Sequence, residues 1–228
     1  MSDFNVNLVQ TILSKGGLSK DVTDKTYDVL QGIKKVLKEF ETVLKREVGK
    51  SDSRIRIHYK DRSNFEAEIK VADDMLLFVM HSNALVFDHG HPVWKNSYVR
   101  LDESRATVGM ISIYNFLSDS FKFERRNDTG HLVARIFVNR EGHFFIEGKR
   151  QLGVLFNDYG THMVNPELLK AIVEQALIFS LEIDVAVPGY DAMKEITVYE
   201  AMVNTMQSTV STGKRLGFKF EGEGEPEA

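Results

Sequence analysis

The residues of this chain with the clearest capacity for chemistry lie in one short segment, Asp88 to Pro92. On an extended backbone, side chains two residues apart point to the same side, so His89 and His91 would offer both imidazoles to one metal ion. Asp88 would point the other way, and a third ligand would have to come from elsewhere. The same residue types also suit a plain loop between strands. We therefore expect Asp88, His89 and His91 to form a loop without bound metal, with a metal site as the alternative.

A second cluster runs from Asp158 to His162 and holds a carboxylate, a phenol and an imidazole in a glycine-containing turn. If the two loops met in space, their His and Asp side chains would suffice for a hydrolytic metal centre or an acid–base pair. Asp158 and His162 are thus the candidate catalytic residues of an enzyme. Nothing in the spacing brings the loops together, and a strand-to-helix connection is the simpler interpretation.

Several enzyme classes are disfavoured by what the sequence lacks. The chain contains no cysteine, which removes thiolate metal sites, disulfides and cysteine nucleophiles. It contains neither of the glycine-rich phosphate loops and no G-x-S-x-G nucleophile elbow. We expect no cofactor.

Basic and aromatic residues alternate around Phe121 to Arg126, and Lys149 and Arg150 follow a second aromatic stretch. Interleaving of this kind on a sheet is used by single-stranded nucleic-acid binders, which makes that function a further alternative. Half-buried strands alternate in the same way, and the net charge of -4 supplies no attractive field. A row of basic residues over 54–60 should likewise be neutralised by Glu66 and Glu68 across a hairpin. We therefore expect no appreciable nucleic-acid binding.

The elements that position these residues indicate an α+β protein. The hydrophobic fraction of 43% and charged fraction of 27% are those of an ordinary globular chain. Residues 1–220 are predicted to form one domain, followed by a disordered acidic tail over 221–228, whose like charges and glycines cannot bury apolar surface. The chain start lacks a secretory signal, and no apolar run reaches about 18 residues, so we expect a cytoplasmic protein with no membrane contact.

Four helices are predicted, two at each end of the chain. Residues 4–13 have apolar side chains at helical spacing and stop at Gly16 and Gly17, and residues 23–48 form a longer helix with one broad apolar face. Asn165 and Pro166 begin a third helix that is apolar on most sides and must be covered by protein. The fourth follows Gly189, with methionines along one stripe.

About eight or nine strands are predicted between these helices, joined mostly by short turns that require antiparallel neighbours. A hairpin with one wet face is expected first, and Gly142 is expected to turn another. The predicted strands cover residues 53–60, 65–71, 75–80, 84–87, 107–116, 121–125, 132–139 and 143–147, with 152–156 as a ninth.

The function favoured by the sequence is a non-catalytic cytosolic binding or assembly module that holds a partner protein or another copy of itself. We expect a homodimer, because the helix over 23–48 and the helix after Pro166 present more apolar face than one sheet layer should cover. An enzyme using the two loops and a single-stranded nucleic-acid binder are the alternatives.

Overall fold

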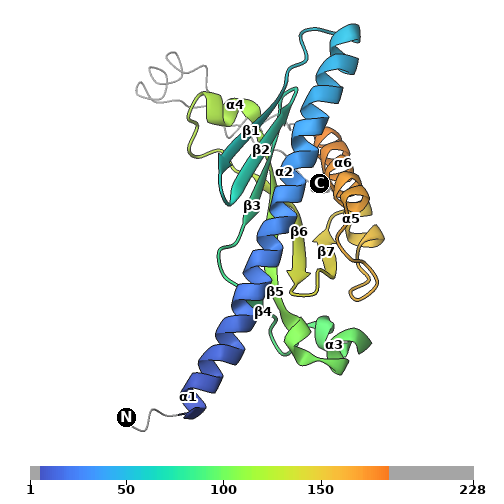
Figure 1. Cartoon of the computed structure of the whole chain (residues 1–228). Coiled ribbons are helices and arrows are strands. Elements are labelled where there is room, and N and C mark those ends of the chain that lie inside the picture. Colours follow the sequence, from blue (N-terminus) through green and yellow to red (C-terminus); the bar gives the residue numbers. More distant parts are fainter. Residues whose placement is uncertain (1–5, 185–228) are drawn as a thin grey trace, which may run out of the picture.

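A long helical rod forms one side of the molecule. The computed structural model describes residues 6–184, and within them α1 (Val6–Thr11), a π-helical segment η1 (Ile12–Gly16) and α2 (Gly17–Ser51) follow one another without a break (Figure 1). The two separate N-terminal helices predicted from the sequence are therefore wrong. Gly16 and Gly17 keep right-handed helical angles, with φ of -67° and -59°, so they extend the helix instead of capping it.

A seven-stranded antiparallel sheet packs against this rod. Its strands run in the order β1-β2-β3-β5-β6-β7, with the short β4 added beside β5. The α+β class and the antiparallel connections predicted from the sequence are confirmed. The strand bounds are β1 Ile57–Ser63, β2 Glu66–Val71, β3 Asp74–Met80, β4 Leu85–Val86, β5 Thr107–Leu117, β6 His131–Asn139 and β7 Phe144–Gly148.

The first hairpin pairs as its hydrophobic alternation predicts. Ile57 lies opposite Val71 and Lys60 lies opposite Glu68. The basic row is shorter than expected, because β1 begins only at Ile57 and Arg54 is bound to Asp52 beside it. The hairpin is tied to the rod by the buried Lys34, whose ammonium lies 2.7 Å from an Asp61 carboxylate oxygen. The charged side chains of this hairpin therefore largely satisfy one another.

Two predicted strands do not form. The strand predicted over 121–125 is the end of α4 (Ser118–Lys122) followed by a turn, and most of the strand predicted over 152–156 lies in α5 (Gln151–Leu155). Short apolar runs do not distinguish strand from helix by periodicity, and here the turns around them decide the conformation. Within residues 6–184 the sheet thus has seven strands where eight or nine were predicted. The helix expected after Gly189 and the acidic tail over 221–228 lie outside the described residues.

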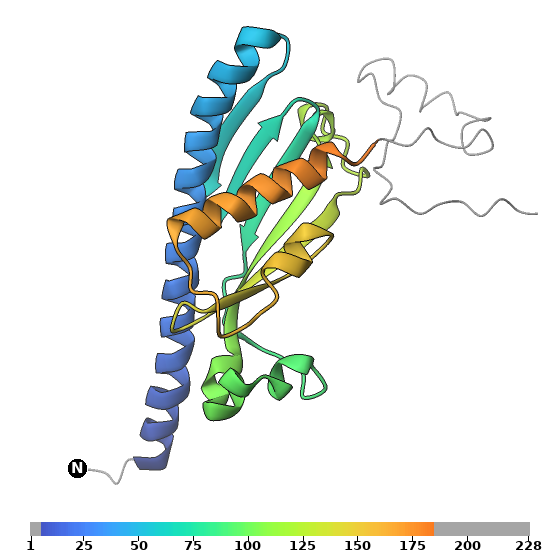
Figure 2. The ribbon, with the colours of Figure 1, turned by 90° about the vertical axis from the view of Figure 1, so that its right-hand side faces the viewer.

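One face of the sheet is covered by α2, α5 and α6 (Pro166–Leu181), as Figure 2 shows. The broad apolar stripe of α2 and most of α6 are buried there, with Ile33, Leu37, Ile172 and Val173 among the residues that exclude water most completely. The Asn165 side chain accepts a 2.8 Å hydrogen bond from the Leu168 amide, which confirms the predicted start of this helix. The two apolar faces on which the homodimer was predicted are therefore used inside the monomer.

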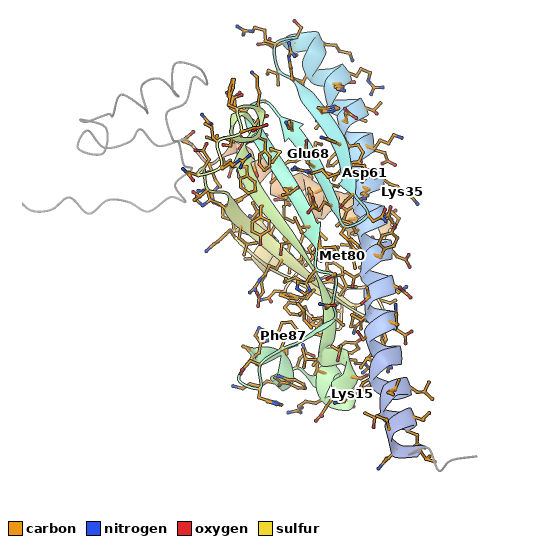
Figure 3. The ribbon with its side chains drawn as sticks, turned by 90° about the vertical axis from the view of Figure 1, so that its left-hand side faces the viewer. Lys15, Lys35, Asp61, Glu68, Met80 and Phe87 are labelled. Atoms are coloured by element: carbon orange, nitrogen blue, oxygen red, sulfur yellow. The ribbon has the colours of Figure 1, made fainter. Side chains whose placement is uncertain are left out.

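Among residues 6–184, no long helix covers the opposite face, as Figure 3 shows from that side. One end of this face is covered by three short helices, η2 (Pro92–Lys95), α3 (Ser97–Leu101) and η3 (Glu103–Ala106). Their residues Val93 and Val99 pack with Phe137 and Phe145 of the sheet in a second, smaller core. This small core holds the histidine-bearing loop in place.

Two asparagines in the sheet, Asn115 and Asn139, are both 0% exposed but differ in their hydrogen bonds. The Asn115 amide has no hydrogen-bond partner among residues 6–184, whereas the Asn139 amide donates to the Tyr98 hydroxyl and accepts from the amides of Glu141 and His143. We expect Asn115→Val to raise the free energy of unfolding by about 1–3 kcal/mol, because it removes a buried polar group that gains nothing from its burial.

The matched variant Asn139→Val should lower the free energy of unfolding, because it removes three hydrogen bonds and leaves the Glu141 and His143 amides without their side-chain acceptor. Urea denaturation of both variants measures the difference. Loss of stability in Asn115→Val equal to that in Asn139→Val would show that the Asn115 amide contributes to the native state.

Candidate functional site

His91, the best of the predicted metal ligands, is held against the sheet. Its Nε2 lies 3.2 Å from a Glu147 carboxylate oxygen, and its Nδ1 accepts a 3.2 Å hydrogen bond from the Val93 amide at the start of η2. The ring stacks on Phe87 with centroids 4.4 Å apart. Because Nδ1 is an acceptor here, the proton of the neutral ring lies on Nε2 and is donated to Glu147. His91 thus links its loop to β7, where Arg135 also binds Glu147.

Asp88 and His89 do not join His91 at a common point. An Asp88 carboxylate oxygen accepts a 2.9 Å hydrogen bond from the Gly90 amide, and its backbone carbonyl accepts one from the Trp94 indole. The His89 ring stacks instead on Trp94, 5.7 Å away between centroids. These contacts close the loop on itself, as expected of a structural connection.

Asp158 and His162 are also separated by their contacts. Asp158 accepts a 2.8 Å hydrogen bond from the Thr161 hydroxyl, while the His162 ring lies near Phe144 and Phe156. The second loop is tied to the residue before α3, since the Asn96 amide donates to the Tyr159 carbonyl at 2.9 Å, but no hydrogen bond or ring contact among the described residues joins Asp88, His89 or His91 to Asp158 or His162. In the described part of the chain, no group of three His, Asp or Glu side chains is arranged to hold a metal ion.

A polar cluster that was not predicted from the sequence centres on Tyr98. Its hydroxyl donates a 2.6 Å hydrogen bond to Glu141 and accepts one of 2.8 Å from Asn139. Arg105 donates to the other Glu141 oxygen at 3.1 Å, and its guanidinium lies 4.2 Å from the centre of the Tyr98 ring. Tyr159 completes the cluster by donating to the Arg105 carbonyl at 2.6 Å. We call these five residues the tyrosine cluster.

The pKa shifts within the tyrosine cluster favour a structural role. Burial and the neighbouring Glu141 carboxylate raise the pKa of Tyr98 to about 12. Burial also raises the pKa of Tyr159. The hydrogen bond from Tyr98, followed by that from Arg105, lowers the pKa of Glu141. Both phenols are therefore neutral and the carboxylate ionised near neutral pH, so the cluster stabilises α3 and η3 on the sheet and offers no group poised for proton transfer.

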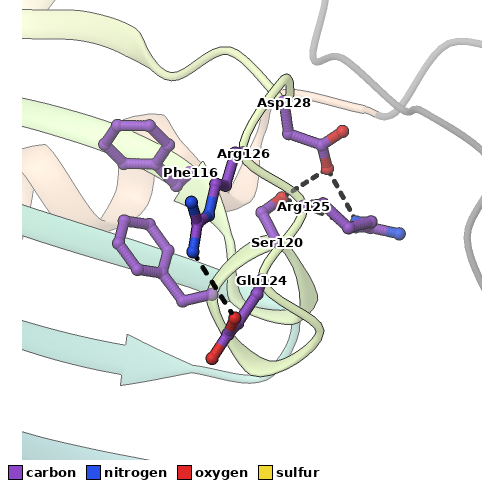
Figure 4. Close-up of a pocket in the computed structure, with 7 residues that line it drawn as sticks. Phe116, Ser120, Glu124, Arg125, Arg126 and Asp128 are labelled. Carbon is purple, nitrogen blue, oxygen red and sulfur yellow. Dashed lines mark hydrogen bonds and ion pairs between the residues drawn. The ribbon is translucent and has the colours of Figure 1, made fainter. Parts of the chain in front are cut away.

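A cavity of about 400 Å³ lies at the other end of the open sheet face, beside α4 (Figure 4). Phe116 and Phe121 form its apolar wall, with ring centroids 5.1 Å apart. Arg125 lies 2.8 Å from the buried Asp128 carboxylate, to which the Ser120 hydroxyl also donates. The predicted basic and aromatic strand is thus replaced by a helical turn whose buried arginine is matched by an acid. Its charges give the cavity no strong preference for an anionic ligand.

A run of exposed apolar side chains lies on residues 6–17, which we call the arm. Every residue of the arm is exposed, and the rod carries it past the end of the sheet (Figures 1 and 2). Polar side chains occupy the opposite side of the same helix, at positions 7, 10, 11 and 14. Five large apolar side chains are between 39% and 70% exposed, namely Val6, Leu8, Val9, Ile12 and Leu13.

The sequence predicted the helical spacing of the arm, but it placed the exposed apolar faces on the helix over 23–48 and on the helix after Pro166. Only the folded chain reveals that the sheet ends before the arm begins. Comparison with protein families, with curated proteins and with solved structures gave no match. Among the described residues, no helix has the length and apolar character needed to cross a membrane.

The role of Glu141 predicts a pH dependence of stability. A carboxylate whose pKa is lower in the folded state stabilises the fold above its unfolded pKa, and this stability is lost as the pH falls through the folded pKa. We expect the wild-type protein to lose stability on acidification below about pH 4.5, and Glu141→Gln to lose less over the same range. Urea midpoints between pH 7 and pH 3 measure both slopes, and equal slopes would contradict this role.

The two histidines of the first loop form a matched pair for a second test. We expect His91→Ala to lower the free energy of unfolding by about 1–3 kcal/mol, because it leaves the Val93 amide and Glu147 without this partner. His89→Ala should change stability by less than about 0.5 kcal/mol, since His89 is exposed and makes only a ring contact. Equal losses in both variants would contradict the structural role of His91.

Proposed function

We propose that this protein is a non-catalytic assembly module, and that its arm joins it to a second copy of itself. The observation that carries this proposal is the exposure of five large apolar side chains on one face of the arm. Contiguous exposed apolar surface of this kind marks interaction sites in soluble proteins. An isolated helix of this length is also marginal in water, so a partner would stabilise it as well as cover it.

The composition of the arm favours a second copy as the partner. Lys15 is the only ionisable side chain between residues 6 and 17. Two identical arms can therefore lie face to face with almost no charge to desolvate or repel, as a two-fold symmetric contact requires. A helix that binds an anionic membrane surface usually carries lysine or arginine along its polar face, whereas this polar face is uncharged at Asn7, Gln10, Thr11 and Ser14.

The structural roles of the predicted site residues agree with a non-catalytic function. His91 and the tyrosine cluster use their hydrogen-bonding groups to fix η2, α3 and η3 to the sheet. Asp158 and His162 remain in a connecting turn before α6. These contacts account for the polar residues of both loops through folding, so they give an enzyme no specific support.

A substitution in the arm tests the assembly directly. We expect the wild-type protein to be dimeric at micromolar concentration, and Ile12→Asp to weaken the dimer at least about 100-fold. Each buried isoleucine contributes roughly 1.5 kcal/mol or more, and the substitution occurs twice in a symmetric dimer. Sedimentation equilibrium over a concentration series measures the dissociation constant.

Ser14→Asp is the matched control, because it adds the same charge to the polar side of the arm. It should leave the dissociation constant within a few-fold of wild type. Far-ultraviolet circular dichroism and urea midpoints verify that both variants stay folded. A wild-type protein that is monomeric up to about 100 μM, far above the micromolar range of specific association, would refute the proposal.

A further inference from the structure

The arm by itself is a small interface. At 1.5 Å per residue it is about 18 Å long. Its five apolar side chains expose on the order of 500 Å² per copy, so two arms would bury about 1,000 Å² in total. Stable specific interfaces bury about 1,200–2,000 Å². A dimer of the proposed kind therefore needs a further contribution from the body of the molecule.

The body offers a strongly exposed apolar side chain at the same end as the arm. Leu101 at the end of α3 is 83% exposed, more than any other large apolar residue among those described. Figures 1 and 2 both place α3 at the end of the molecule from which the arm projects. Val99, two residues earlier in the same helix, is instead 0% exposed and packs in the second core.

The backbone that carries Leu101 is held rigidly. Asn96 caps α3 by accepting a 2.9 Å hydrogen bond from the Tyr98 amide, and Tyr98 is fixed by Glu141 and Asn139. At the other end of the helix, Asp102 binds Arg140 of the β6–β7 turn at 3.1 Å. A rigidly presented apolar side chain loses little conformational entropy on binding, which makes it an efficient contact.

The arm of the same copy does not cover Leu101. The rod is anchored at Thr26, whose hydroxyl lies so close to β5 that a Cβ at Gly109 would come within 1.9 Å of it. From that anchor the helix runs straight past the sheet, and every arm residue remains exposed. Leu101 is thus available to an arm that belongs to another molecule.

We infer that the dimer is antiparallel, with the Val6 end of each arm lying across the partner's α3 and covering Leu101. This inference rests on the proposed self-association. An antiparallel pair places the tip of one arm beside the root of the other, and α3 lies at this end of the molecule, to one side of the rod. A parallel pair would set the two Lys15 ammonium groups against each other and would leave Leu101 uncovered. The antiparallel arrangement therefore joins both exposed apolar surfaces in one symmetric interface.

Single cysteines test this arrangement cleanly, because the natural chain contains none. We would mix Val6→Cys protein with size-tagged Leu101→Cys protein and oxidise them under mild conditions. The expected result is a mixed disulfide between the two variants, with little self-cross-linking of Val6→Cys. Val154→Cys is the control, because Val154 is 76% exposed but lies on α5 and should not cross-link to Val6→Cys. Self-cross-linking of Val6→Cys as the main product would overturn the inference in favour of a parallel pair.

A second measurement separates this inference from the proposed function. We expect Leu101→Asp to weaken the dimer at least about tenfold without lowering the urea midpoint, since the side chain is exposed in the monomer. Val154→Asp should leave the dissociation constant unchanged. If Ile12→Asp dissociates the dimer but Leu101→Asp has no effect, the assembly through the arm stands and the α3 contact is wrong. A monomeric wild-type protein would refute both.

Discussion

The close contact between α2 and β5 is the constraint on which the rest of the molecule depends. Gly109 has no side chain at the point where Thr26 approaches the sheet, so the helix lies directly on the central strand. The Thr26 hydroxyl is satisfied by the Val22 carbonyl at 2.7 Å, which allows a polar group to be buried there without loss. This contact fixes the distance and direction of the rod, and α6 then packs beside it on the same face.

As a consequence of this packing, the two faces of the sheet carry different kinds of side chain. The face under α2 and α6 holds the main core, and its side chains are almost entirely apolar. The opposite face carries charged side chains in contact with water, and many of these side chains form ion pairs. Arg62 lies 3.0 Å from Glu68, and Arg135 binds the same Glu147 carboxylate as His91. Polar residues that suggested a functional site in the sequence, such as His91, thus pair with charged residues on this second face of the sheet.

Local patterns in the sequence predicted the elements whose side chains alternate or repeat over several residues. The first hairpin, the central strands and the helix capped by Asn165 follow from such patterns. Gly142, with φ of +84°, turns the β6–β7 hairpin as predicted, because glycine adopts this conformation without strain. Gly16 and Gly17 carry the same residue type but no such requirement, and a right-handed helix continues through them. Composition alone does not distinguish the two cases.

The parts that could not be predicted depend on contacts between distant segments. Tyr98 and Glu141 are separated by 43 residues, and no local spacing relates them. The faces of α2 and α6 appeared too apolar for one sheet layer, because the sequence does not reveal that the helices cover each other as well as the sheet. The arm is the opposite case, because its apolar spacing is that of an ordinary buried helix. Its side chains are exposed because the sheet ends before the arm begins.

The π-helical turn at the root of the arm has a geometric consequence for the surfaces on either side of it. A π turn takes up one residue more than an α turn, so the helix before it is rotated by about 100° relative to an uninterrupted α-helix. The π turn therefore shifts the hydrophobic stripe of the arm by about this angle from the direction that the same residues would take in a continuous α-helix. Deleting one residue from this turn would restore α-helical spacing and leave the flanking helical segments in the same relative orientation, because the extra residue is accommodated within the turn. The backbone of these five residues thus helps to set the direction in which the arm presents its side chains.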